Sequence, residues 1–228
     1  MEEEPADVTD LDQLTVAVLG GTGPQGRGLA RRFALAGLTV ELGSRAAERA
    51  AEVAQRLATD TGGRITGAAN REAAARADIV VVAVPWEGHA ELLADLSDAL
   101  AGKLVIDCVN PLGFDQQGAY ALEVPEGSAA QQAAALLPRS RVVAAFHHVS
   151  AVLLEDPDVS SLDTDVLVLG EDRADTDLVQ ELAGLVPGMR GIYAGRLRNA
   201  HQVEALTANL VSINRRYKAH AGVRVTDV

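Results

Sequence analysis

Short β-branched runs and longer stretches with helical spacing alternate along most of the chain. Strands are predicted at residues 15–19, 38–42, 65–67, 78–84, 103–108 and 141–146. Helices are predicted between them at residues 24–36, 45–58, 71–77, 87–100 and 128–137. Strands that alternate with helices in this way form parallel βαβ units. The pattern therefore predicts an α/β fold built on a doubly wound, mostly parallel sheet.

The pattern changes after residue 150. An acidic loop at residues 156–165 precedes a strand at 166–169, a helix at 176–185, a strand at 189–193 and the longest helix, 198–221. Apolar positions at helical spacing predict the buried face of that helix: Val203, Leu206, Leu210, Ile213 and Tyr217. We expect a disordered acidic tail at 1–13, a dinucleotide-binding domain at 14–150 and a small C-terminal α/β lobe at 151–228. Residues 114–127 are expected to form a polar loop over a site.

Candidate chemistry begins where the first strand ends. Gly21, Gly23 and Gly26 form a GxGxxG motif between a strand and a helix, the context that a dinucleotide-binding Rossmann fold requires. Gly21 is expected to allow the sharp turn, Gly23 to let a pyrophosphate approach the backbone, and Gly26 to let the helix pack closely on the sheet. Pro24 and Gln25 open that helix, whose free N–H groups and positive dipole end attract phosphates. A purely structural glycine turn is the alternative.

The end of the second strand is where a Rossmann fold selects its cofactor. An Asp or Glu there accepts hydrogen bonds from the ribose 2′-hydroxyl of NAD and repels a 2′-phosphate. This chain has Ser44 and Arg45 at that place, with Arg49 one helical turn further on. These groups, joined by the hydroxyl of Thr22, are typical of a receptor for a dianion. The sequence therefore favours NADP(H), with solvated helix charges as the alternative for both arginines.

Two further strand ends bring polar and aromatic residues to the same edge of the sheet. Val84, Pro85 and Trp86 should border the cofactor crevice, since ligands bind beyond the carboxyl ends of parallel strands. Trp86 is alternatively a packing residue at the start of the next helix. Asn110 is a candidate partner for the nicotinamide side or a ribose, and alternatively a turn residue before proline.

The strand at residues 141–146 leads into His147 and His148. Their position at a strand end favours a role in the site, whereas burial as structural histidines is the alternative. The spacing of neighbouring carboxylates and cysteines does not indicate a metal site. Cys108, at the end of an apolar strand, is expected to be a small buried side chain rather than a nucleophile.

Composition restricts the possible partners. The net charge of −12 argues against general nucleic-acid binding, and a single cysteine excludes an internal disulfide, which suits a reducing cytosol. No apolar run is long enough for a bilayer, and the acidic N-terminus does not resemble a signal peptide, so a cytoplasmic protein without membrane contact is expected. Residues 196–228 carry six Lys or Arg against two acids. This excess is either a solvated helix face or an electrostatic funnel for an acidic second substrate.

Taken together, these motifs resemble the NADPH-dependent coenzyme F420 reductases, the F420-dependent NADP oxidoreductases. The resemblance covers residues 15 to about 222 and rests on VAVLGGTGPQGRGLA at 16–30, LGSR at 42–45, VAVPWEGH at 82–89, AFHHVSA at 145–151 and RNAHQVEALTANLVSINRRY at 198–217. It implies reversible hydride transfer between carbon 4 of the nicotinamide of NADP(H) and carbon 5 of the 8-hydroxy-5-deazaflavin. Such a reaction needs the two rings about 3 to 3.5 Å apart with water excluded, and no catalytic acid, base or nucleophile.

The resemblance also assigns residues to the two coenzymes. It implies that Thr22, Ser44, Arg45 and Arg49 hold the 2′-phosphate of NADP(H). A deazaflavin pocket is implied at His147, His148, Val149, Ala205, Leu206 and Thr207. The C-terminal lobe would bind the deazaflavin and join two chains into a homodimer through the last helices. The phosphate and glutamate tail of F420 would give the basic C-terminal excess a purpose.

The chain departs from the family pattern at two places. Some relatives carry adjacent arginines after the serine, whereas Ala46 follows Arg45 here and leaves Arg49 as the second phosphate contact. A small hydroxyl is usual where Ala205 stands, so one deazaflavin hydrogen bond would be missing. The alternatives are another NADPH reductase, acting on a flavin, a ferric centre or an imine, and a non-catalytic NADPH-sensing module.

Overall fold

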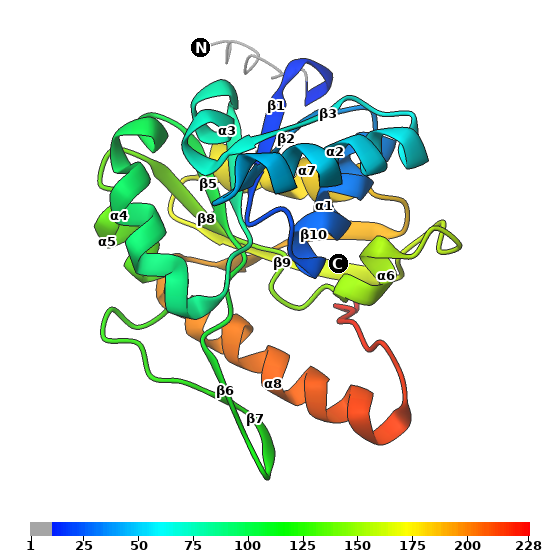
Figure 1. Cartoon of the computed structure of the whole chain (residues 1–228). Coiled ribbons are helices and arrows are strands. Elements are labelled where there is room, and N and C mark those ends of the chain that lie inside the picture. Colours follow the sequence, from blue (N-terminus) through cyan, green and yellow to red (C-terminus); the bar gives the residue numbers. More distant parts are fainter. Residues whose placement is uncertain (1–10) are drawn as a thin grey trace, which may run out of the picture.

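The computed structural model describes residues 11–228 (Figure 1). The predicted acidic tail falls mostly on residues 1–10, outside the described residues, while Leu11–Gln13 form a turn of 3-10 helix (η1). The strands and helices after it follow each other largely as predicted. The first strand, β1, has the predicted bounds Thr15–Leu19, and most other elements differ from their predicted bounds by one to three residues. The alternating βαβ pattern is therefore confirmed.

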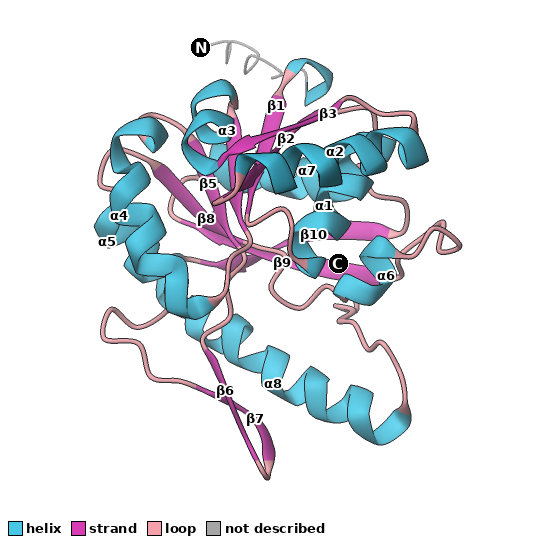
Figure 2. Ribbon diagram, in the orientation of Figure 1, coloured by secondary structure: helices cyan, strands magenta, loops and turns pink. Residues whose placement is uncertain are grey.

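A single eight-stranded sheet forms the middle of the molecule, in the order β10-β9-β8-β5-β4-β1-β2-β3 (Figure 2). Its other strands are β2 (Thr39–Ser44), β3 (Ile65–Ala69), β4 (Ile79–Val82), β5 (Leu104–Asp107), β8 (Arg141–Ala144), β9 (Thr164–Gly170) and β10 (Met189–Gly195). All neighbouring strands are parallel except β8 and β9. The six strands from β3 to β8 follow the 3-2-1-4-5-6 order of a Rossmann sheet, with β8 in the sixth place.

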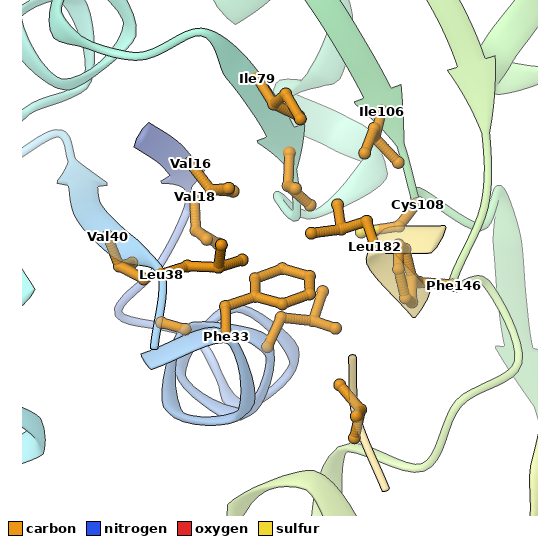
Figure 3. Packing of buried hydrophobic residues seen from close by; sticks show 14 of the residues in the cluster. Val16, Val18, Phe33, Leu38, Val40, Ile79, Ile106, Cys108, Phe146 and Leu182 are labelled. Atoms are coloured by element: carbon orange, nitrogen blue, oxygen red, sulfur yellow. The ribbon is translucent and has the colours of Figure 1, made fainter. Parts of the chain in front are cut away.

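Helices cover both faces of the sheet. The helices are α1 (Pro24–Leu35), α2 (Ala47–Thr61), α3 (Asn70–Arg76), α4 (His89–Leu100), α5 (Ala129–Leu136), α6 (Ala151–Glu155), α7 (Arg173–Gly184) and α8 (Ala200–Tyr217), with 3-10 turns at Trp86–Gly88 (η2) and Leu197–Asn199 (η3). Successive side chains of a strand point to opposite faces. Val16 and Val18 accordingly join a core with α1, α2 and α7, whereas Ala17 and Leu19 join a second core with α3, α4 and α5. Figure 3 shows the first core, where the rings of Phe33 and Phe146 meet edge to face at 5.9 Å.

The strands predicted for a separate C-terminal lobe belong to the main sheet. β9 pairs with β8, and β10 pairs with β9, so the predicted boundary at residue 150 does not divide the sheet. Asp165 on β9 anchors the last residues of the chain there. Its buried carboxylate accepts hydrogen bonds from Arg190 at 2.7 and 2.8 Å, from Arg224 at 2.6 Å and from the backbone N–H of Val225 at 2.7 Å. The two arginines hold the pKa of Asp165 well below its usual range.

The prediction of a loop at residues 114–127 is wrong for its first half. β6 (Leu112–Asp115) and β7 (Gly118–Ala121) form an antiparallel hairpin, because Asp115 accepts hydrogen bonds from the N–H groups of Gln117 and Gly118 and so closes the turn. Figure 1 shows this hairpin, in green, at the end of the molecule where α8, in orange, also lies, and β7 packs against α8.

The predicted buried face of α8 is correct only in its first half. Val203 and Leu210 are buried and Leu206 is half-buried, but Ile213 and Tyr217 are exposed. The first half packs on Ala144 and Leu169 of the sheet, whereas the second half extends past it. The apolar stripe of α8 is therefore longer than the part of the sheet that covers it within one chain. None of the helices within residues 11–228 combines the length and apolar character that crossing a bilayer requires.

Candidate functional site

The carboxyl ends of five parallel strands bring the predicted site residues to one edge of the sheet. The carboxyl ends of β1, β2, β4, β5 and β8, with the segments that follow them, carry in that order the glycine turn, Ser44 with Arg45, the run Val84 to Trp86, Asn110, and the two histidines. This edge is where open α/β sheets bind their ligands.

The sharp turn after β1 is made at Gly20 and not, as predicted, at Gly21. Gly20 has φ +73°, a conformation that side chains disfavour, and a Cβ there would lie 2.5 Å from the carbonyl oxygen of Ala83 and 2.7 Å from Val84 Cγ1. The glycine turn therefore packs directly against the residues that follow β4. The Gly-Gly pair at the strand end was the signal for this turn.

Gly21 and Gly26 allow close approach within the protein itself. A Cβ at Gly21 would lie 2.6 Å from Leu42 Cγ, and one at Gly26 would lie 2.7 Å from the Cα of Gly21. Gly23 differs from both, because its backbone is extended at φ −82° and the nearest atom to a Cβ would be the Gly20 oxygen at 3.4 Å. The fold therefore has room for a side chain at Gly23.

The start of α1 offers unpaired backbone donors beside this open space. Gly23 is its N-cap, no side chain caps it, and Pro24 has no N–H, so Gln25 and Gly26 present the free amides of the first turn. The backbone of Thr22 is held by Arg27, which donates to the Thr22 carbonyl oxygen at 2.7 Å and pairs with Glu155 on α6. A helix N-terminus with free N–H groups can bind a phosphate.

Ser44, Arg45 and Arg49 lie together where β2 passes into α2. Ser44 is the last residue of β2, and its buried hydroxyl oxygen accepts from the N–H of Ala46 at 3.3 Å. Arg45 and Arg49 are exposed, and neither guanidinium has an ion pair within residues 11–228. No side chain caps α2, which begins at Ala47. Two available cations thus stand beside an uncapped helix N-terminus, an arrangement that suits a phosphate.

A polar clamp connects the segment after β8 to α1, to the segment after β5 and to α8. Gln25 donates to the carbonyl oxygen of Phe146 at 3.2 Å. Asn110 and Thr207 both donate to the carbonyl oxygen of His147, at 2.8 and 3.2 Å. Phe146 has φ +64°, which is strained for a residue with a side chain, so these bonds hold a backbone conformation that would otherwise be disfavoured. The side-chain amides of Gln25 and Asn110 therefore already donate hydrogen bonds to backbone carbonyl oxygens.

The two histidines of this segment are buried and neutral. Burial lowers the pKa of His147 and of His148 to about 4. His148 accepts a hydrogen bond at Nε2 from the N–H of Leu167 at 3.4 Å, whereas neither ring nitrogen of His147 has a partner among the described residues. Buried polar atoms are rarely left unpaired, so the His147 ring is an exception within the described residues.

The other predicted pocket residues lie next to the clamp residues in the sequence. Val149 is buried after the two histidines, and Ala205, Leu206 and the clamp residue Thr207 occupy half-buried positions on α8. At the opposite side of the edge Pro85 is exposed and Trp86 is half-buried in η2. Cys108 is buried as predicted, with its Sγ 3.0 Å from the Val82 carbonyl oxygen, and burial raises the pKa of its thiol.

The basic C-terminal excess is partly neutralised within the chain. Arg196 pairs with Glu171, and Arg224 pairs with Asp163 and Asp165. These two of the six predicted cations are therefore unsuited to a funnel for an acidic substrate. Arg215 and Arg216, at the last turn of α8, are exposed.

Sequence reasoning missed a buried polar network around His89, next to Trp86. His89 on α4 is fully buried and contacts Asp107 Oδ2 at 2.6 Å and Gln132 Oε1 at 3.0 Å. Nearby, the carboxylate of Glu204 on α8 accepts from the N–H groups of Ala129 and Ala130 at 2.9 and 3.1 Å, and so caps α5 from another helix. The signal for His89 was its spacing from the apolar positions of α4 at residues 93, 96 and 100, which places it on the buried face.

The sheet order and the glycine turn together define this chain as a Rossmann-type α/β protein. Residues 15–111 match the family model described as NADP oxidoreductase coenzyme F420-dependent. The F420-dependent NADP reductase of Methanothermobacter marburgensis is 38% identical over 223 residues, which cover 94% of this chain and 99% of the relative. That of Methanothermobacter thermautotrophicus is 39% identical over 225 residues, covering 94% and 96%.

A crystal structure described as a candidate F420-dependent NADP-reductase from Arthrobacter sp. FB24 is also similar, with a TM-score of 0.78 and 26% identity. The likeness covers 93% of this chain and 99% of that one. The present chain belongs to the family of coenzyme F420-dependent NADP oxidoreductases. The resemblance noted in the sequence is thereby confirmed.

Proposed function

We propose that this protein transfers a hydride reversibly between NADP(H) and coenzyme F420. The observation that carries the proposal is the polar clamp at Phe146 and His147. There α1, the segment after β5 and α8 all donate hydrogen bonds to one backbone segment. Relatives that match nearly the whole chain are named F420-dependent NADP reductases, which supports the same two coenzymes here.

The nucleotide half of the site fits NADP(H). The open space at Gly23 and the free amides of Gln25 and Gly26 would take the pyrophosphate. Ser44, Arg45 and Arg49, with Thr22, would take the 2′-phosphate; the side chains of Val84, Pro85 and Trp86 would border the rest of the nucleotide. Two observations support NADP(H) over NAD(H). The guanidinium groups of Arg45 and Arg49 have no ion pair within the described residues and can bind a 2′-phosphate. The end of β2 carries Ser44 and no carboxylate that would repel that phosphate.

The second half of the site fits a heterocyclic coenzyme. His147, His148 and Val149 would form one wall, and Ala205, Leu206 and Thr207 the other. The hydrogen bonds that Asn110 and Thr207 donate to the His147 carbonyl oxygen support this placement, because they bring the two walls together. When bound, F420 supplies the carbon that accepts or releases the hydride.

The chain's own contribution is to position the two coenzymes and to exclude water. The neutral histidines add no charge to the crevice, and no acid, base or nucleophile is needed for direct hydride transfer. The clamp from Gln25, Asn110 and Thr207 fixes the segment between the two halves, so a small set of hydrogen bonds determines how the coenzymes face each other.

An activity measurement tests this proposal. We expect purified protein to reduce NADP⁺ with reduced F420, followed by absorbance at 340 nm, and to use NAD⁺ at least 100-fold less efficiently, a difference of about 2.7 kcal/mol. FMN and FAD serve as comparison acceptors with NADPH. Reduction of a flavin without any reaction of F420 would contradict the proposal, and equal rates with NADP⁺ and NAD⁺ would contradict the 2′-phosphate site.

We also propose a cytoplasmic homodimer joined through α8. Four exposed apolar side chains gather on α8 and the adjoining hairpin: Phe114 at 70%, Tyr120 at 47%, Ile213 at 40% and Tyr217 at 73%. Ile213 and Tyr217 continue the buried stripe of α8, as expected if a second copy covers what one chain leaves open.

Sedimentation velocity tests the dimer. Ile213→Glu together with Tyr217→Glu should convert the protein to a monomer, because two charges would be buried in an apolar interface. Val152→Glu is the matched control, since Val152 on α6 is 57% exposed and lies outside this surface. A wild-type protein that sediments as a monomer at micromolar concentration would refute the proposal.

A further inference from the structure

His89 occupies an unusual position for a histidine, fully buried and bonded at both ring nitrogens. Its Nε2 faces a carboxylate oxygen of Asp107 at 2.6 Å and its Nδ1 faces Oε1 of Gln132 at 3.0 Å. The amide of Gln132 is oriented by its own Nε2, which donates to Glu126 at 3.2 Å. Both partners of the imidazole are therefore acceptors. Only the doubly protonated ring can donate to both, so this geometry selects an imidazolium.

The ring of His89 lies against Trp86. Their centroids are 5.5 Å apart and the planes are inclined by 30°. An imidazolium at this distance attracts the indole ring through its π face. Trp86 belongs to η2, which follows β4 at the edge where the nucleotide is proposed to bind. The ring contact therefore joins buried His89 to the segment that follows β4.

We propose that His89 is a positioning residue for NADP(H): its imidazolium, fixed by Asp107 and Gln132, holds the Trp86 ring against the nucleotide crevice. This inference rests on the proposed function, because it takes the crevice beside Trp86 to be the nucleotide site. His89 does not contact the reacting atoms. Loss of its proton leaves Gln132 Oε1 or Asp107 without a donor, and the Trp86 ring loses its attraction to the cation.

The electrostatic surroundings of His89 favour the protonated ring. Burial alone would lower the pKa of His89, but the charge of Asp107 and the hydrogen bonds to Asp107 and Gln132 raise it above its usual value. The other titratable groups facing it are Glu204 on α8 and, behind Gln132, Glu126. Burial raises the pKa of Glu204 to about 7, against the two N–H groups of α5 that lower it.

The direction of the pH effect follows from the raised pKa. A histidine whose pKa is raised in the folded protein contributes fully below its unfolded value of about 6.5 and loses that contribution as the pH rises through the raised value. Affinity for NADP⁺ should accordingly fall above neutral pH. Trp86 is the single tryptophan of the chain, so its fluorescence reports this change directly.

The test measures Trp86 emission and, separately by calorimetry, the Kd of NADP⁺ between pH 6 and 10. We expect an emission transition at a pH above the ordinary histidine value of about 6.5 and a Kd that rises about tenfold with the same midpoint. Gln132→Leu removes one acceptor but keeps the Asp107 pair, so both midpoints should move down in pH by about one unit. His89→Gln should abolish the emission transition and the pH dependence of Kd, and His220→Gln, at an exposed histidine, should change neither.

The inference would be overturned if Gln132→Leu left both pH midpoints unchanged. It would also be overturned if the Kd of NADP⁺ did not change over the same pH range as the Trp86 emission. The outcomes also separate this inference from the proposed function. If the NADP⁺ affinity changes with pH together with the Trp86 emission but F420 is not reduced, the proposed function fails and the role of His89 stands. If hydride transfer proceeds while the affinity is independent of His89, only the present inference fails.

Discussion

Gly23→Ala should leave the stability of the protein unchanged and weaken NADP⁺ binding about 100-fold, a loss of about 2.7 kcal/mol. The backbone at Gly23 is extended, and a Cβ there would have its nearest contact at 3.4 Å from the Gly20 oxygen, an ordinary van der Waals distance. The fold itself therefore tolerates alanine. The predicted purpose of Gly23 is to let the pyrophosphate reach the backbone, and a methyl group would stand in that place. Thermal unfolding and calorimetric titration measure the two effects on the same preparation.

Gly21→Ala is the matched control, because the same methyl group should lower the folding stability at Gly21, whereas it should leave the stability unchanged at Gly23. Its Cβ would lie 2.6 Å from Leu42 Cγ and 2.8 Å from the Val18 carbonyl oxygen. Overpacking of this kind costs roughly 1 to 3 kcal/mol of folding free energy. A Gly23→Ala variant that binds NADP⁺ as tightly as the wild type would contradict the placement of the pyrophosphate.

The sequence predicted the sheet well because buried parallel strands are short apolar runs whose position depends little on other parts of the chain. Residues 15–19 match β1 in full, and the GxGxxG motif lies where it was expected. Within the motif, the sequence did not separate Gly20, which makes the turn, from Gly23, which leaves space for a ligand. That distinction depends on distances to Ala83 and Leu42, which are remote in sequence.

Contacts between distant segments were the part that could not be predicted. The hairpin at residues 112–121 has a closing signal in Asp115 and Gly118, but its exposed Phe114 and its two glycines obscure the alternation of a strand. The clamp on His147 joins residues 37 and 60 positions away from it, and the His89 network joins four elements. A histidine at one apolar helix position indicates burial, yet only the folded chain supplies Asp107 and Gln132 as its two acceptors.

The two uses of polar residues at this edge have different consequences for mutation. Gln25, Asn110 and Thr207 are bonded to the backbone of residues 146–147, so their removal should disturb the position of both coenzymes together. Arg45 and Arg49 have no ion pair within residues 11–228 and are exposed, so their removal should affect the ligand alone. The selectivity for NADP(H) can therefore be tested without damage to the fold.

Arg45→Ala combined with Arg49→Ala should lower kcat/KM for NADP⁺ about 1,000-fold, or about 4 kcal/mol of transition-state stabilisation, and leave kcat/KM for NAD⁺ within about twofold. Each guanidinium is expected to contribute a charge-assisted contact of about 1.5 to 3 kcal/mol to the 2′-phosphate, which NAD⁺ lacks. Steady-state kinetics with both nucleotides, with reduced F420 held saturating, give the two values.

The control for this pair is Arg56→Ala, an exposed arginine later on α2 that lies away from the end of β2. It changes the net charge in the same direction without touching the proposed phosphate site, so it should shift both nucleotides equally and only slightly. Ser44→Glu adds the converse test: a carboxylate at the end of β2 repels the 2′-phosphate and accepts from a 2′-hydroxyl, so preference should move toward NAD⁺. Equal losses for NADP⁺ and NAD⁺ in the double variant would mean that the two arginines act through the common part of the nucleotide, and the 2′-phosphate would then have to bind elsewhere along this edge.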